Sequence, residues 1–271
     1  KSRAVEFSQR LKELKLDVDW CCAMRVPRID IDTLKMMKDA GCTFIGYGFE
    51  SASQKVLNSM KKKINIGQIR NAIELTERAG LGVQANFIYG DPAETRETMK
   101  ETSEFFNRYC RDHIVHNGFI IPFPGSEVFE HCIRERIIDD RHKYYDTIHK
   151  MPIYNMTEMD DDIFLGLLKP ILVDTKYKVA SIIADTESEK IRIHATCPHC
   201  NSGIEYVFPT RYDIIYSSTA RAFCSQCHKR FNIPTTPLLK PTMKNFLKQR
   251  KIISLLRTLR MYLKRLVVRS H

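Results

Sequence analysis

Four of the nine cysteines fall in two C-x-x-C pairs, and they are the residues with the clearest chemistry in the sequence. Cys197 and Cys200 form the first pair, Cys224 and Cys227 form the second, and 23 residues separate the pairs. A zinc ion in a tetrahedral site takes four soft ligands, and each C-x-x-C turn presents two thiolates from one tight loop. The spacing therefore predicts a closed, structural zinc site, with redox-active cysteine pairs as the alternative.

The segment around these cysteines, 190–234, is predicted to be a small zinc ribbon. Two apolar runs between the pairs, 206–208 and 214–216, suit the strands of a β-hairpin. Three histidines lie close enough in sequence to substitute for a cysteine ligand: His194, His199 and His228. Four thiolates already complete a tetrahedral site, so we expect no catalysis there.

A second set of candidate residues follows three predicted strands, each at the point where a strand ends. Glu50 comes directly after one strand, the glycine turn Gly90-Asp91-Pro92 follows the next, and a rigid turn at 122–125 follows a third. Each turn alone could be an ordinary connection between a strand and a helix. Because α/β proteins place their sites at the carboxyl ends of parallel strands, three such turns in succession indicate a functional edge.

The elements that must position these turns alternate along residues 1–135. We predict strands at 18–24, 42–49, 83–89 and 116–121, and helices at 32–40, 51–60, 66–79 and 91–110. An Ala-Gly pair ends two of the helices, at Gly41 and Gly80. Ser51 with Gln54 has the capping-box pattern, and Asp91 is placed to cap the helix that follows it. This rhythm predicts an α/β fold with a parallel sheet, and its four strands are too few for a closed eight-stranded barrel.

The order and spacing of these motifs resemble the radical SAM superfamily, in particular the branch that often carries an N-terminal cobalamin-binding domain. The resemblance covers about residues 1–140. It rests on the following runs, in this order: Trp20…Arg25; Ala40-Gly41-Cys42…Gly48-Phe49-Glu50-Ser51…Leu57…Met60…Lys62; Ala79-Gly80…Phe87-Ile88-Tyr89-Gly90-Asp91-Pro92-Ala93-Glu94-Thr95; Pro122-Phe123-Pro124-Gly125-Ser126. It implies the latter half of a partial (βα)6 barrel, with S-adenosylmethionine and a [4Fe-4S] cluster as cofactors and cobalamin supplied by a missing N-terminal domain.

By the same resemblance, five residues are expected to contact the cofactor. Glu50 and Lys62 match positions that approach its methionine or ribose part, where a carboxylate suits an ammonium and a lysine suits a carboxylate. Arg25 matches a frequent basic residue on the third barrel strand. Gly90 and Glu94 match the fifth-strand turn near the adenosyl group. No catalytic residue is assigned.

The sequence does not contain the C-x-x-x-C-x-x-C loop that binds the cluster in this superfamily. The five remaining cysteines, Cys21, Cys22, Cys42, Cys110 and Cys132, cannot form that spacing. Three thiolates are needed to hold the cluster. We therefore expect a fragment of a radical SAM enzyme, inactive by itself, and the N-terminus, which has neither an initiator Met nor a signal peptide, suggests a chain cut from a longer one.

The remaining segments are a helical connector and a basic tail. We predict an irregular stretch at 136–161 and a helical segment at 162–186 that breaks near Pro170. The tail, 235–271, carries ten Lys or Arg and no acid, and its leucines recur at helical spacing. It could lie on an anionic membrane, contact nucleic acid, or pack on the barrel with its charges solvated.

We thus predict four regions: the C-terminal half of a radical SAM barrel (1–140), a helical connector (141–189), a four-cysteine zinc ribbon (190–234) and a basic amphipathic tail (235–271). The intact protein is expected to abstract hydrogen from, or methylate, a small-molecule or lipid substrate. The alternative is a non-catalytic module that binds nucleic acid or membrane through ribbon and tail. Cysteine usage and the absence of a long apolar run predict a cytoplasmic protein without a transmembrane helix, peripheral to the membrane if the tail binds it.

Overall fold

The structure is a computed structural model that describes residues 2–173, 178–186, 190–209 and 219–234. It divides into two compact units, residues 1–175 and residues 176–271. The two units are described separately below.

The first unit is built on a four-stranded parallel sheet. Its strands pair in chain order, so that each strand has its sequence neighbours as its hydrogen-bonded neighbours: β1 (Trp20–Met24), β2 (Cys42–Glu50), β3 (Gly82–Tyr89) and β4 (Ile114–Phe119). The expected α/β class and parallel sheet are confirmed.

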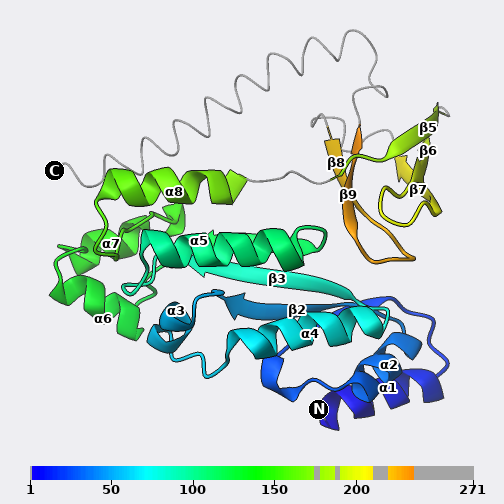
Figure 1. The fold of residues 1–271 in the computed structure, drawn as a ribbon, viewed down its shortest axis with the longest axis horizontal. Helices are drawn as coiled ribbons and strands as arrows, with labels where there is room; N and C mark the ends of the chain where they lie inside the picture. The colour runs from blue at the N-terminus through cyan, green and yellow to red at the C-terminus, as the bar shows by residue number, and fades with distance from the viewer. Residues whose placement is uncertain (1, 174–177, 187–189, 210–218, 235–271) are drawn as a thin grey trace. The chain divides into compact units, whose positions relative to one another are not determined.

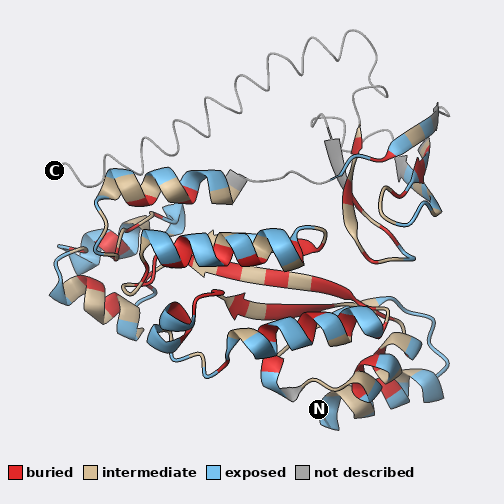
Figure 2. Ribbon diagram, in the orientation of Figure 1, coloured by how far each residue is buried: buried red, intermediate tan, exposed pale blue. Residues whose placement is uncertain are grey.

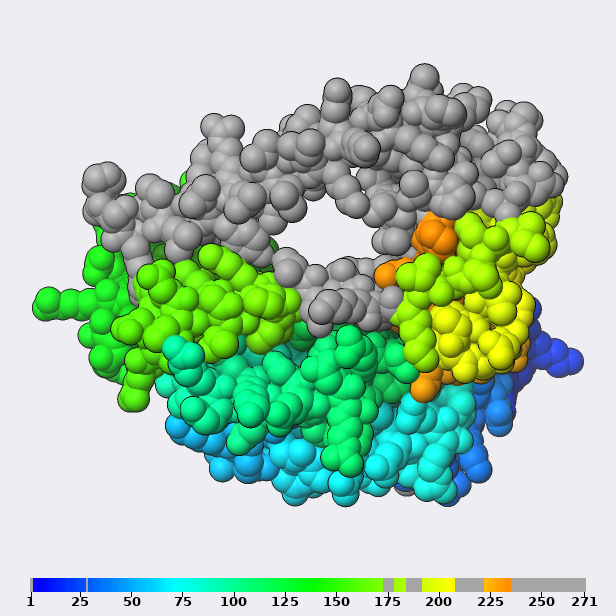
Figure 3. Space-filling view, turned by 45° about the horizontal axis from the view of Figure 1, so that its top comes forward, coloured from blue at the N-terminus to red at the C-terminus, as the bar shows by residue number. Residues whose placement is uncertain are grey.

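Helices connect the strands and cover one face of the sheet. Their bounds are α1 (Ser2–Glu13), α2 (Ile31–Asp39), α3 (Gln54–Ser59), α4 (Ile66–Arg78), α5 (Arg96–Phe105), α6 (Glu127–Arg134), α7 (Arg141–Thr147) and α8 (Asp161–Val173). Short helical turns lie at Val26–Arg28, Phe106–Cys110 and Ile148–Lys150. Helices α8, α5 and α4 follow one another across the outer face of this unit (Figures 1 and 3).

The core lies between these helices and one face of the sheet. Along β3, buried residues alternate with half-buried ones, as expected for a strand with one covered face. Figure 2 shows this alternation on β3. Phe49, Phe87 and Tyr47 are fully buried on the covered face, and the Tyr47 hydroxyl lies 2.7 Å from the Thr76 hydroxyl of α4.

Glycines end α2 and α4, as predicted. Gly41 has φ +88° and Gly80 has φ +72°, a left-handed conformation that costs glycine little. A side chain at Gly41 would also clash with the backbone carbonyl of Val18. Each turn therefore leads directly from the end of a helix into the next strand of the sheet.

The described residues of the second unit form two small antiparallel sheets. One holds β5 (Ser181–Thr186), β6 (Lys190–Thr196) and β7 (Gly203–Pro209), and the other holds β8 (Thr219–Phe223) and β9 (Arg230–Pro234). Its core is small, with Phe231 and Ile233 of β9 packed near Ile193 and Ala195 of β6. The predicted pairing of 206–208 with 214–216 is not tested, because 214–216 lies outside the described residues.

Two predicted helix starts are wrong. Helix α5 begins at Arg96, and its cap is Thr95, which forms a capping box with Thr98, while Asp91 turns its carboxylate to the backbone N–H of Ala93. In α3 the Ser51 hydroxyl accepts from the N–H of Ser53, so no Ser51–Gln54 box forms. In both places the side chain stabilises a tight turn before the helix instead of the helix itself.

The prediction for the connector is also partly wrong. Residues 181–186 form strand β5, not helix, and 136–161 contains the short helix α7. Helix α8 continues through Pro170 to Val173. No helix among the described residues is long and apolar enough to cross a membrane. The basic tail, 235–271, lies outside the described residues, and its contact with membrane or nucleic acid stays a prediction.

Candidate functional site

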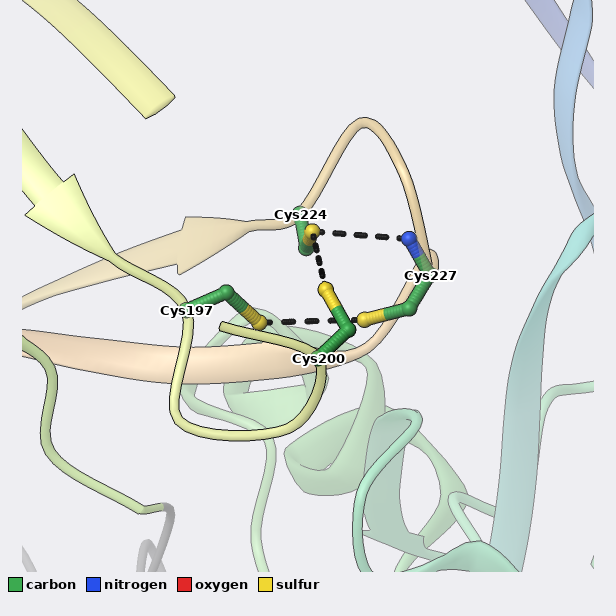
Figure 4. Close-up of side chains that lie close together, drawn as sticks. All are labelled: Cys197, Cys200, Cys224 and Cys227. Atoms are coloured by element: carbon green, nitrogen blue, oxygen red, sulfur yellow. Dashed lines mark hydrogen bonds between the residues drawn. The ribbon is translucent and has the colours of Figure 1, made fainter. Parts of the chain in front are cut away.

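The four predicted zinc cysteines come together at one end of the second unit. Cys197 and Cys200 lie in the turn between β6 and β7, and Cys224 and Cys227 lie in the turn between β8 and β9. All four sulfur atoms lie within 4.8 Å of one another. Two of these contacts join the two turns: 3.7 Å between Cys197 and Cys227, and 3.6 Å between Cys200 and Cys224 (Figure 4).

These distances fit a single metal ion with four sulfur ligands. At a zinc–sulfur distance of about 2.3 Å, tetrahedral geometry places the sulfurs about 3.8 Å apart. A four-iron cluster is larger than one ion and holds its cysteine sulfurs farther apart. The donor set and its spacing thus suit zinc, and the site is closed by its own four ligands.

The two cysteine turns share one backbone design. In each turn, the residue after the second cysteine donates its N–H to the carbonyl of the first cysteine: Asn201 to Cys197 and His228 to Cys224, both at 2.9 Å. Asn201 and His228 both have positive φ, 61° and 56°. Each turn therefore fixes the backbone that carries its two cysteines.

Backbone donors also point at the sulfur atoms. The N–H of His199 donates to Cys197 Sγ, and the N–H of Cys227 donates to Cys224 Sγ, each at 3.4 Å. The hydrogen bond between Cys200 Sγ and Ser202 Oγ, 3.2 Å long, lowers the pKa of Cys200 to about 6. Donors to sulfur favour the thiolate, which is the form that binds metal.

None of the three nearby histidines belongs to the four-residue ligand group. His199 Nε2 lies 2.9 Å from the backbone oxygen of Arg230, His194 faces Glu205 at 3.6 Å, and His228 packs against the Phe223 ring. The histidines therefore hold the surrounding backbone and rings in place and do not complete the site.

The second candidate site lies at the carboxyl end of β2. Glu50 and Lys62 form an ion pair of 2.6 Å, with side chains 16% and 33% exposed. Glu50 has φ +66°, and the pairing of β2 with β3 shifts register between Gly48 and Glu50. A non-glycine residue in this conformation is strained, and such strain concentrates at functional sites.

The absence of a side chain at Gly48 leaves space for the side chain of Glu50. A Cβ atom at Gly48 would clash with Glu50 Oε1 and would lie 3.3 Å from Lys62 Nζ. Only glycine leaves room for the ion pair over this strand. In the sequence analysis Gly48 appears only within a family motif and has no role of its own, although a glycine inside a strand is itself a signal of close approach by another group.

Glu94 lies inside the turn that follows β3. Its carboxylate accepts a hydrogen bond of 2.5 Å from the N–H of Gly90, and its exposed fraction is 1%. Burial raises the pKa of Glu94 to about 7. Gly90 has φ +101°, and a Cβ there would lie 3.4 Å from the Phe164 ring. Gly90 and Glu94 thus stabilise the turn through a buried hydrogen bond. The carboxylate of Glu94 does not lie at the surface.

Arg25 is placed one strand away from Glu50 and Lys62. It follows the end of β1, is exposed, and lines a cavity of about 530 Å³ together with Phe7 and Trp20. The structure brings Glu50 and Lys62 together, while Gly90 with Glu94 and Arg25 lie at the ends of the two flanking strands. Their contact with a cofactor stays a prediction.

No second cysteine site is present in the part of the chain that the structure describes. There, the four ribbon cysteines are the only group of three or more His, Cys, Asp or Glu side chains close enough to share a metal ion. Cys42, Cys110 and Cys132 are buried, and all five cysteines outside the ribbon are free thiols. The described residues do not fit a [4Fe-4S] cluster.

Comparison with known proteins finds similarity in the first unit. Residues 2–106 match the family model of the radical SAM superfamily. An uncharacterized methyltransferase of Pyrococcus horikoshii is 32% identical over 51% of this chain and 30% of its own length. An anaerobic magnesium-protoporphyrin IX monomethyl ester cyclase of Rubrivivax gelatinosus is 30% identical over 53% of this chain and 26% of its own.

Solved structures give a weaker likeness. The radical S-adenosylmethionine methyltransferase TsrM from Kitasatospora setae, with cobalamin and a [4Fe-4S] cluster bound, shares 18% identity over 49% of this chain and 27% of its own, with a TM-score of 0.39. The chain spans less than a third of the length of the two relatives above. Residues 2–106 are therefore similar to part of a radical SAM domain.

Proposed function

We propose that this chain is the part of a radical SAM enzyme that holds S-adenosylmethionine at the carboxyl edge of the β1–β4 sheet. The observation that carries the proposal is the Glu50–Lys62 ion pair, because a side-by-side carboxylate and ammonium complement the ammonium and carboxylate of the methionine group. The family match over residues 2–106 supports the identity of the cofactor.

The chemistry is hydrogen abstraction or methyl transfer. Bound to a reduced [4Fe-4S] cluster, S-adenosylmethionine supplies the one-electron chemistry for either reaction. The thiolates for that cluster come from outside these 271 residues, which contain no C-x-x-x-C-x-x-C loop. Methyltransferases among the relatives favour methyl transfer, with cobalamin held by another domain. This chain's own task is to orient the cofactor and to shield it from water.

The four ribbon cysteines are proposed to bind one structural zinc ion. Support comes from the four-sulfur donor set, the 3.6 and 3.7 Å spacing and the backbone donors aimed at the sulfur atoms. The expected metal content is about one zinc and no iron per chain. Elemental analysis of the purified chain tests this, and stoichiometric iron would contradict it.

Binding of S-adenosylmethionine to the full chain, measured by calorimetry or ligand-observed NMR, tests the cofactor site. Glu50→Gln and Lys62→Gln should each weaken binding about tenfold, because each removes one charge-assisted contact. Lys100→Gln, on the outer face of α5, is the matched control and should bind as the wild type does. A wild-type chain that does not bind S-adenosylmethionine would overturn the proposal.

A further inference from the structure

Two free thiols of the first unit form a pair across neighbouring strands. Cys22 of β1 and Cys42 of β2 are joined by a hydrogen bond between their side chains. Both pack in the core of this unit, where Cys42 is 1% exposed and Cys22 is half-buried. Two thiols in contact can share a proton, which an isolated core cysteine cannot do.

The strands hold this pair in place. Trp20 lies opposite Cys42, and Cys22 follows Trp20 by two residues on the same face of β1. Cys22 and Cys42 are therefore diagonal neighbours. Trp20 is itself anchored, because its indole N–H donates to the carbonyl of Ala40 at 2.7 Å and its own carbonyl accepts from the Thr43 hydroxyl at 3.2 Å.

A cavity leads to one of the two thiols. It measures about 530 Å³ and lies between α1 and β1, with Arg3, Ala4, Phe7 and residues 20–25 as its lining. Cavities of this size hold small molecules. Cys22 belongs to the lining and Cys42 does not. A small reagent in the cavity therefore meets Cys22, while Cys42 stays behind it in the core.

The hydrogen bond divides the two protons unequally. It lowers the pKa of Cys22, against burial, which raises it. The same hydrogen bond raises the pKa of Cys42, and burial adds to the increase. Cys42 thus keeps its proton and donates it, and the Cys22 thiolate, the nucleophilic form, accepts. By contrast, burial raises the pKa of Cys110 and that of Cys132 to about 11.

The charges at the cavity favour anions. The side chains of Arg3 and Arg25 both line it, and a guanidinium is always charged in proteins. A reagent that carries carboxylates is therefore attracted, more strongly at low salt than at high salt. Two further titratable groups act on the thiol pair, Lys38 of α2 and Cys21.

We propose that Cys22 is a modification site that exchanges with small anionic disulfides through this cavity, and that Cys42 is a positioning residue that donates a hydrogen bond to its sulfur. The Cys22 thiolate attacks one sulfur of the disulfide, the disulfide bond breaks, and the other half leaves as a thiolate. Cys22 is oxidised to a mixed disulfide, the departing half is reduced, and Cys42 keeps its proton. This site is independent of the proposed cofactor site.

The test uses the full chain with Cys21→Ser and the dicarboxylate disulfide 5,5′-dithiobis(2-nitrobenzoate), with the modified residues located by peptide mass spectrometry. Cys22 should react before the buried cysteines. Cys42→Ala should raise the midpoint of the pH–rate profile by about one pH unit. At pH 7 the rate should then fall only about threefold, because a thiol of higher pKa is a better nucleophile once ionised. Cys42→Ser keeps a donor and should restore the midpoint.

Controls separate this role from a general loosening of the core. Cys110→Ala removes another buried thiol of the same core and should leave the profile of Cys22 unchanged. Arg3→Gln should slow the anionic disulfide and not the uncharged 2-hydroxyethyl disulfide. NMR spectra of each variant establish that it folds. If Cys22 reacts no faster than Cys110 in the folded chain, the site is wrong. An unchanged midpoint in Cys42→Ala would refute the role of Cys42.

Discussion

The two candidate sites are assembled in opposite ways. The four-cysteine site is made by two short turns, each of which fixes its own geometry through a hydrogen bond between residues four apart. The strand-end site depends on the register of a whole sheet, because Glu50, Gly90 and Arg25 are carried by three different strands. Local chemistry defines the first site, whereas a hydrophobic core must form before the second exists. Variants that disturb only the cysteine turns, or only the core of the first unit, test this difference between the two sites.

The largest effect is expected from removing one of the four proposed zinc ligands. Cys224→Ser should lower the zinc content from about one per chain to near zero and unfold the β8–β9 pair, because metal binding supplies folding free energy to such small domains. Elemental analysis and amide hydrogen exchange measure this. Cys21→Ser, an exposed cysteine of β1, is the matched control. A Cys224→Ser chain that keeps its zinc would contradict the assignment.

A core truncation should act on the first unit alone. Phe87→Ala is expected to lower the free energy of unfolding of that unit by about 3–5 kcal/mol, because it leaves a cavity under the sheet. Trp20, the only tryptophan, reports on this unit by fluorescence during urea unfolding. Phe123→Ala, at a phenylalanine that is 61% exposed, should change stability little. Zinc loss from Phe87→Ala would show that the two units are not independent.

Glu94 should make the first unit less stable as pH rises. Its pKa is about 7 in the folded chain against 4.5 ordinarily, so the folded state binds more protons between those values. The free energy of unfolding should therefore fall between pH 4.5 and 7, by up to about 1.4 kcal/mol per pH unit.

Glu94→Gln keeps an acceptor for the N–H of Gly90 and cannot ionise, so its stability should lack this pH dependence. Urea unfolding followed by Trp20 fluorescence at pH 5 to 8 measures the difference. Glu104→Gln, on the exposed face of α5, should keep the wild-type profile. Parallel profiles for the wild type and Glu94→Gln would refute the buried-carboxyl interpretation.

The smallest effect is expected in the first cysteine turn. Asn201 has φ +61°, so Asn201→Gly should stabilise the second unit by less than about 1 kcal/mol, since glycine adopts this conformation without strain. Competition with a zinc chelator would register the change as slightly tighter metal binding. Ser225→Gly, in the other turn at a position without positive φ, should not tighten binding.

The same contrast explains what could be predicted from sequence. The two C-x-x-C pairs identified the four-cysteine site directly, because its ligands and its turns are local. Gly41 and Gly80 gave two helix ends correctly for the same reason. The start of α5 was missed because an Asp-Pro pair serves a tight turn as well as a helix cap, and the Thr95–Thr98 box lies just beyond it.

Other features depend on contacts that no local pattern encodes. The apolar run at 181–184 suits either helix or strand, and its pairing with β6 decides for strand. Glu50 and Lys62 were selected only through the family resemblance, which did not predict that they form an ion pair. The Glu50 side chain lies over Gly48, and the Glu50 backbone is left-handed. Both features accompany the register shift between β2 and β3, which sequence spacing does not reveal.

The strand order β1-β2-β3-β4 has a consequence for how the first unit is made. Each strand pairs with the one synthesised just before it, so a chain leaving the ribosome always has a finished edge on which to add its next strand. Removing the edge strand β4 leaves every other pairing intact, whereas removing β2 or β3 divides the sheet. Tolerance to deletion of a strand should therefore be lowest at the two central strands, β2 and β3.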